Sequence, residues 1–399
     1  MFDTLCTYPL NSDLFAQSIH PSAPILALGL ASGHVQLNRL PPSDPSSAPQ
    51  DGRSCIETAW RTRRHKGSCR SLCFSHDGDN IFSGGSDGIV KVASTENGRV
   101  HSKIAVPLQS ASLDPATLIH ALSPQTLLLA TDSSALYLYD LRADSTVATS
   151  KPQQTHHPHD DYISSLTPLP PTDNSTSGFN KQWITTGSTN VAVTDLRRGI
   201  LVQSEDLEEE LLSSAIVGSK LVVGGERGGL RLWEVGVWDD NEVTFTVGKR
   251  ASADVQVAAP EGVGKEQLLA VGMDDGSIKV VGMGGKRPRV IGDMNHDEVE
   301  GVLGLGFDVG GRMCSGGGAI VKVWEESLKN TDDDEEEEVP GVNGKRDRES
   351  ESEVADSESG GRTSSEEEKK PKRNKKKRKR NKGKDKSGGP HVMAFSGLD

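Results

Sequence analysis

Residues 65–94 read HKGSCRSLCFSHDGDNIFSGGSDGIVKVAS. This stretch predicts three short strands separated by two tight turns. Leu72 and Phe74 alternate with polar neighbours, as they do in a half-buried strand. Residues 76–79 and 83–88 supply the glycines and aspartates that hairpin turns need. A sheet this small cannot bury both of its faces, so the stretch predicts further copies of itself along the chain.

Copies of the last strand of this unit recur through the sequence, preceded in most cases by a turn of small residues. The matching positions are separated by steps of roughly 39 to 55 residues. They are Asn38, Ala93, Tyr139, Thr194, Trp233, Val281 and Trp324. Seven units at this period predict an all-β fold, a seven-bladed β-propeller with four strands in each blade. We assign residues 1–330 to this propeller.

The last unit ends at Trp324-Glu325 and lacks an outer strand of its own. Residues 4–8 form a short candidate strand ahead of the first full unit. We therefore expect the N-terminal strand to complete the last blade and close the ring, because an open ring would expose strand edges.

The charge of the chain is unevenly distributed. Of the 57 acidic and 45 basic residues, 18 and 17 follow position 330, which leaves a net charge of −11 on residues 1–330. An acidic ring is a poor general surface for nucleic acid, because it repels phosphates.

The five cysteines form no C-x-x-C pair, and their odd number does not fit a framework of paired disulfides. We therefore expect the protein to reside in a reduced, intracellular compartment. The first residues lack the basic and apolar regions of a secretory signal. No run approaches the roughly 18 apolar residues that a membrane span needs.

The repeats resemble the WD-repeat family. The Trp-Asp dipeptide of that family is eroded to Tyr139-Asp140, Thr194-Asp195, Trp233-Glu234 and Trp324-Glu325. The resemblance also implies a hydrogen-bonded network that starts from a histidine before the first strand of a blade. His65, His159 and His296 occupy this position.

No group of residues predicts catalysis, a cofactor or a metal site. Asp274-Asp275 matches the repeat turn at Ser86-Asp87, and the histidines of residues 156–160 are better read as a loop with one network histidine. The glycine pairs and triplets lack the Lys-Ser/Thr of a phosphate-binding loop. We therefore expect a monomeric, non-enzymatic protein without a small-molecule substrate.

The composition changes abruptly after position 330. Residues 331–368 are acidic and rich in Ser and Glu, and we expect them to be disordered because they contain almost no apolar residues. Residues 369–399 contain a basic run that is typical of nuclear and nucleolar targeting and could contact RNA. Its targeting residues are Lys369, Lys370, Lys372, Arg373, Lys375, Lys376, Lys377, Arg378, Lys379, Arg380 and Lys382. Phe395 and Leu398 belong to a terminal apolar group, for which two interpretations are open, a short docking motif and a frayed chain end.

The degenerate propeller, the acidic and then basic tail and the terminal Phe-Ser-Gly-Leu together resemble the fungal Jip-five branch of the WD repeat-containing protein 55 family. The resemblance implies a nucleolar scaffold of ribosome biogenesis that acts on the large subunit and in pre-rRNA processing. Its implied partners are pre-ribosomal assembly factors.

A second hypothesis comes from Tyr139-Asp140-Leu141-Arg142 and Thr194-Asp195-Leu196-Arg197. These segments resemble the Trp-Asp-x-Arg motif of propellers that serve as substrate receptors of cullin-RING ubiquitin ligases. The resemblance implies that Arg142 and Arg197 contact the ligase adaptor.

Overall fold

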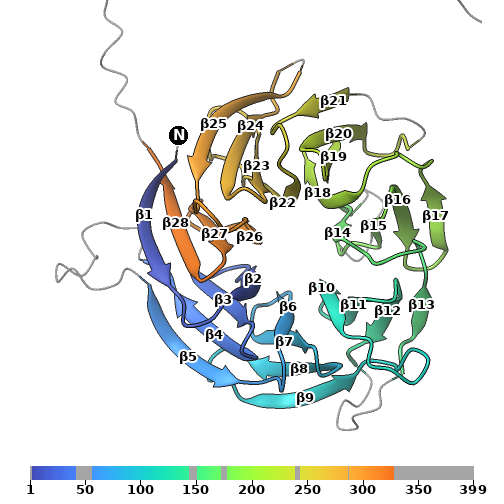
Figure 1. Cartoon of the computed structure of the whole chain (residues 1–399). Helices are drawn as coiled ribbons and strands as arrows, with labels where there is room; N and C mark the ends of the chain where they lie inside the picture. The colour runs from blue at the N-terminus through green and yellow to red at the C-terminus, as the bar shows by residue number, and fades with distance from the viewer. Residues whose placement is uncertain are drawn as a thin grey trace, which may run out of the picture. The chain divides into compact units, whose positions relative to one another are not determined.

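The computed structural model describes residues 2–41, 56–142, 151–171, 178–238, 243–285 and 287–327. Within these ranges the secondary structure consists of strands, arranged as seven four-stranded antiparallel sheets. Figure 1 shows the sheets as blades placed around a common axis. The described residues contain no helix that is long and apolar enough to cross a membrane.

Blades one to three each take four consecutive strands. Blade one contains β2 (Leu14–Ile19), β3 (Ile25–Leu30), β4 (His34–Arg39) and β5 (Glu57–Arg63). Blade two contains β6 (Cys69–Phe74), β7 (Asn80–Gly85), β8 (Ile89–Ser94) and β9 (Val100–Ala105). Blade three contains β10 (Ala116–Ser123), β11 (Thr126–Thr131), β12 (Leu136–Asp140) and β13 (Gln154–His156).

Blades four to six continue in the same way. Blade four contains β14 (Ser165–Pro168), β15 (Gln182–Gly187), β16 (Asn190–Asp195) and β17 (Gly199–Gln203). Blade five contains β18 (Leu211–Val217), β19 (Lys220–Gly225), β20 (Gly229–Glu234) and β21 (Val243–Thr246). Blade six contains β22 (Ala253–Ala258), β23 (Leu268–Met273), β24 (Ser277–Gly282) and β25 (Arg289–Asn295).

Blade seven joins the two ends of the ring. It contains β26 (Gly304–Phe307), β27 (Met313–Gly317), β28 (Ile320–Glu326) and, as its outer strand, β1 (Phe2–Pro9). Strand β1 runs antiparallel to β28 from Phe2 opposite Glu326 to Pro9 opposite Ile320. The predicted closure of the ring by the N-terminal strand is therefore confirmed.

The seven recurrent positions predicted from the sequence all fall in the third strand of a blade and are all at least 96 % buried. They pack in apolar layers between neighbouring blades. Between blades two and three, for example, Phe82, Val92 and Ile104 meet Leu127 and Tyr139. The seven-bladed propeller predicted from the repeats is confirmed.

The sequence pattern predicts that blade three spans about residues 104–142 and blade four about residues 156–198, and both starting points are wrong. Ile104 lies in the outer strand of blade two, and His156 lies in the outer strand of blade three. The outer strand β13 has three residues, all of them polar, so no hydrophobic alternation marks it in the sequence.

The antiparallel order of the strands sorts the connections onto two faces. The lower face carries the turns from first to second and from third to fourth strand, such as residues 75–79, 124–125 and 140–142. The upper face carries the turns from second to third strand and the connections between blades, such as residues 204–210 and 296–303.

Candidate protein-binding surfaces

The predicted histidine network of blade two is formed. His65 Nδ1 lies 2.9 Å from Asp87 Oδ1, and His65 Nε2 lies 3.1 Å from Ser83 Oγ. Burial lowers the pKa of His65. Gly85 is required beside this ring, because a Cβ atom at that position would lie 2.2 Å from His65 Nδ1. The network fixes the connection between blades one and two on the upper face.

Blades four and seven form the network with other partners. His159 bonds to Asn190 and, at 2.9 Å, to Thr185 Oγ1. In blade seven, the Trp324 indole donates to Ser315 Oγ at 2.7 Å. The same hydroxyl lies 2.8 Å from Nδ1 of the buried His296. The roles that the sequence predicts for His159 and His296 are therefore confirmed.

Blade five replaces the histidine with a buried acid that the sequence analysis missed. Glu209 forms an ion pair of 3.1 Å with Arg231 and accepts a hydrogen bond from the Arg227 amide at 3.0 Å. The only sequence signal for this role is the position of Glu209 in the connection before β18. The three equivalent histidines and Glu209 thus hold the upper-face connections in fixed positions.

The upper face of blades four to seven is strongly acidic. The loops and turns there carry Asp160, Asp161, Glu205, Asp206, Glu208, Glu209, Glu210, Glu226, Asp274, Asp275, Asp297, Glu298 and Glu300. The lysines and arginines of the same loops and turns are Arg227, Lys249 and Arg250. This excess of carboxylates generates a negative potential that attracts basic partners.

Burial and neighbouring carboxylates shift the pKa values of two groups near these loops. The Tyr162 hydroxyl donates a hydrogen bond to Glu210, and burial together with this carboxylate raises the pKa of Tyr162. Burial and the neighbouring Asp274 raise the pKa of Asp254.

Large apolar side chains are exposed on the upper face in blade one and in the connections that lead to blades three and seven. Phe15 lies near the upper end of the innermost strand of blade one and is 48 % exposed. Leu113 and Leu303 precede the innermost strands of blades three and seven, and Val299 is 82 % exposed. Exposed apolar groups beside charged loops are typical of protein-binding surfaces.

Arg142 and Arg197 occupy equivalent lower-face turns of two adjacent blades, and both are exposed. Arg142 is held by Asp140, with Nε and Nη2 donating at 2.9 and 2.6 Å, and this pairing lowers the pKa of Asp140 to about 2. The Arg197 amide donates to Asp195 at 2.9 Å. The two arginines therefore lie on one face, with the Arg142 guanidinium turned toward its own turn.

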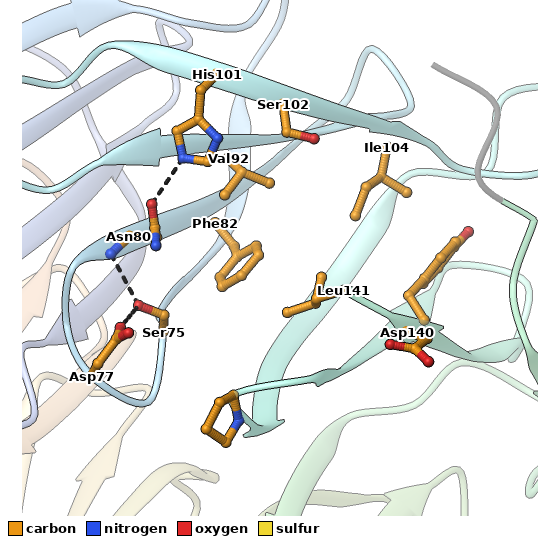
Figure 2. Close-up of a pocket in the computed structure, with 12 residues that line it drawn as sticks. Ser75, Asp77, Asn80, Phe82, Val92, His101, Ser102, Ile104, Asp140 and Leu141 are labelled. Carbon is orange, nitrogen blue, oxygen red and sulfur yellow. Dashed lines mark hydrogen bonds between the residues drawn. The ribbon is translucent and has the colours of Figure 1, made fainter. Parts of the chain in front are cut away.

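The lower face is hollowed at several places. A hollow of about 230 Å³ lies between blades two and three, and we call it the blade 2–3 groove. Its lining residues are Ser75, Asp77, Asn80, Phe82, Val92, His101, Ser102, Ile104, Pro124, Tyr139, Asp140 and Leu141. Figure 2 shows Phe82, Val92 and Leu141 turned toward the same space. Two wider hollows flank the loop of residues 259–267 in blade six.

The described residues contain no group of three or more His, Cys, Asp or Glu side chains placed to hold a metal ion. Asp274 and Asp275 cap backbone amides of a turn, at 2.9 Å from Ser252 N and Ser277 N respectively. Cys69 and Cys73 are free thiols whose pKa values burial raises to about 12 and about 11. The two carboxylates therefore stabilise turns, and the two buried thiols are poor nucleophiles.

The predicted targeting residues, Lys369 to Lys382, and the predicted docking residues, Phe395 and Leu398, lie outside the described residues.

Comparison with known proteins agrees with this architecture. A family model described as WD domain, G-beta repeat matches residues 55–93, which include most of the stretch that predicts the fold. The chain is 56 % identical to WD repeat-containing protein JIP5 of Coccidioides immitis over the full length of both chains. It is 50 % identical to the jip5 protein of Emericella nidulans, again over both full lengths. It is 53 % identical to the jip5 protein of Aspergillus terreus, over 86 % of this chain and 85 % of the relative. With these identities and coverages, the chain belongs to the fungal WD repeat-containing protein JIP5 family.

Proposed function

We propose that this protein is a nucleolar scaffold of ribosome biogenesis that serves the assembly of the large subunit and the processing of its pre-rRNA. The propeller provides a closed, rigid frame for protein partners, and the basic run of residues 369–386 directs the protein to an RNA-rich compartment. The observation that carries the proposal is the acidic upper face with its exposed apolar side chains.

The charge of the upper face selects the class of partner. Carboxylates such as Glu205, Glu298 and Glu300 repel RNA phosphates, so this face is unsuited to RNA itself. Proteins that bind ribosomal RNA must be basic, because they neutralise phosphates with lysine and arginine. Such proteins carry a positive charge that is complementary to the acidic loops, so they could bind the propeller before they bind ribosomal RNA.

Affinity purification of the tagged full chain from nuclear extract tests this function. Mass spectrometry and RNA sequencing should identify large-subunit assembly factors together with pre-rRNA. A variant that lacks residues 369–386 should disperse from the nucleolus. Recovery of neither assembly factors nor pre-rRNA with the full chain would overturn the proposal.

The alternative function, adaptor binding in a cullin-RING ubiquitin ligase, is favoured by one observation. Arg142 and Arg197 are both exposed at equivalent turns of neighbouring blades, so a single partner could contact both. A ligase adaptor recovered in near-stoichiometric amount without pre-rRNA would favour this alternative.

A further inference from the structure

We propose that two copies of this chain associate through the outer strand of blade four, β17, which pairs antiparallel with β17 of the second copy. The dimer takes the place of the monomer that we expected from the sequence alone. The scaffold function does not depend on this association, so either proposal can fail without the other.

The outer strand β17 has an open edge. The strand order in blade four is β14-β15-β16-β17, so one edge of β17 pairs with β16 and the other pairs with no strand of the residues that the structure describes. Figure 1 shows β17 at the outer rim of the ring. The backbone N–H and C=O groups along such an edge can pair with a further strand.

The side chains of this strand are apolar and exposed. β17 reads Gly-Ile-Leu-Val-Gln, and Ile200, Leu201 and Val202 are 38 %, 37 % and 36 % exposed. These three aliphatic residues are consecutive, and no charged residue lies within the strand. An uncharged edge strand that exposes apolar side chains to water favours pairing with another strand.

The other outer strands of the described ring carry features that discourage such pairing. Charged residues lie within β1, β5, β9 and β25, for example Arg61 in β5 and Lys103 in β9. β13 has only three residues, and β21 has four, of which the exposed ones are threonines. Charged side chains and very short strands are common protection for sheet edges. Strand β17 therefore differs from the other outer strands in chemistry rather than in position.

The residues that flank β17 carry opposite charges at its two ends. Arg197 and Arg198 precede the strand, and Glu205 and Asp206 follow it. All four side chains are exposed, and none of them takes part in an ion pair within the described ranges. The segment thus has a basic end, an apolar centre and an acidic end.

This charge pattern identifies a second copy as the occupant of the edge. A two-fold interface needs a surface that is complementary to itself. When two such segments run antiparallel with Leu201 of both copies at the axis, Arg197 lies opposite Glu205 of the second copy. Arg198 then lies diagonal to Asp206 of the second copy, within reach of a long side chain. Parallel strands would instead place like charges side by side.

The association should be weak and dependent on concentration. The register of β16 and β17 shifts between Val193 and Thr194, a bulge that increases the twist of the outer strand. The strand contributes few residues, whereas a standard interface contains roughly 20–30 residues from each partner. We therefore expect a reversible dimer rather than a permanent one.

Sedimentation equilibrium of the purified full chain at increasing concentrations tests the proposal. We expect the average mass to rise from that of one chain toward that of two. A mass equal to that of one chain at every concentration would overturn the proposal. It would do so even if Leu201→Lys removed another protein from the purified complex, because the edge would then bind a different strand.

A matched pair of variants tests the strand itself. Leu201→Lys should weaken the association by about tenfold or more, because a lysine from each copy would lie at the axis. Ile291→Lys adds the same charge to another outer strand, β25, where Ile291 is 42 % exposed, and should leave the association unchanged. Melting temperatures confirm that both variants are folded. A dimer that survives Leu201→Lys would contradict the proposal.

Reversal of the flanking charges tests the antiparallel register without changing the strand. One variant combines Arg197→Glu with Arg198→Glu, and the other combines Glu205→Arg with Asp206→Arg. Each variant alone should associate less than the wild type, because like charges then meet at both ends of the pairing. An equimolar mixture should regain the association, because the opposite charges face each other again. A mixture that associates no more than the separate variants would overturn the pairing.

Discussion

Thr4 of β1 lies opposite Trp324 of β28, so the ring is closed by pairing between the first and last strands of the propeller. The pairing gives blade seven its outer strand and covers the edge of β28. Phe2 extends the closure into the core, where its ring centroid lies 6.0 Å from that of Phe307. The stability of the whole ring therefore depends on a segment of eight residues.

Removal of that segment should destabilise the whole propeller. We expect deletion of residues 1–9 to lower the melting temperature by many degrees, because the edge of β28 and the core around Phe2 become exposed. The single change Phe2→Ala should cost about 3–5 kcal/mol, the usual range for a buried phenylalanine. Leu5→Ala on the same strand is a matched control, since Leu5 is 39 % exposed. Equal effects of the two substitutions in urea unfolding would contradict the closure account.

Ser315 should be the most sensitive serine of blade seven. Ser315→Ala removes the partner of both the Trp324 indole and His296 Nδ1, which are buried. Each buried polar group left without a partner costs about 1–3 kcal/mol, so we expect a loss of about 2–4 kcal/mol. Ser112→Ala, at an exposed turn, should change the free energy of unfolding by less than about 0.5 kcal/mol. If Ser315→Ala also lowered the free energy of unfolding by less than about 0.5 kcal/mol, the network would contribute little to stability.

Acidification should destabilise the fold through its buried histidines. Burial lowers the pKa values of His65, His159 and His296, and lowers that of His120 to about 4. The unfolded chain, with histidine pKa values near 6.5, then binds protons more readily than the folded chain. Stability is therefore complete above about pH 6.5 and falls toward pH 4, by up to about 1.4 kcal/mol per pH unit for each histidine.

Urea unfolding at several pH values measures this slope. His120→Leu should reduce this slope, because one histidine with a lowered pKa is removed. The low pKa of Asp140, about 2, places the loss of its ion pair below this window. A free energy of unfolding that is constant between pH 6.5 and 4 would refute the prediction.

The lower-face arginines distinguish the two functions. If the protein serves ribosome assembly, the double change Arg142→Ala and Arg197→Ala should leave its association with pre-ribosomal proteins unchanged. The change should also leave stability nearly unchanged, because Arg142 and its pair with Asp140 are exposed to solvent and ion pairs of this kind contribute little. Purification of the variant would instead support the ligase alternative if an adaptor bound to the wild type were lost.

The sequence predicted the fold best in strands whose hydrophobic residues recur regularly and are buried. The third strand of each blade packs between neighbours on both faces, so its apolar positions recur clearly, as Ala93 and Trp233 illustrate. Closure by residues 4–8 was predictable because the last unit lacks a strand. The outer strands were harder, because a short, exposed strand such as β13 carries little hydrophobic pattern.

The candidate binding surfaces are formed by loops that only the closed ring brings together, so they could not be predicted from the sequence. Glu209 replaces a network histidine with an acidic residue, and its pairing with Arg231 reveals the equivalence. Glu226 and Glu298 are far apart in the sequence, and the ring order of the blades places both on the upper face. Their joint potential is a property of the folded ring.

Cross-linking mass spectrometry of the complex purified with the full chain tests the central claim most directly. We expect basic assembly proteins to cross-link to upper-face residues 204–210, 274–275 and 297–300. Glu298→Lys with Glu300→Lys should weaken these proteins' recovery, whereas Glu96→Lys with Glu261→Lys, an equal change of charge on the lower face, should not. Cross-links confined to the lower face, with recovery equal for both pairs, would contradict the account.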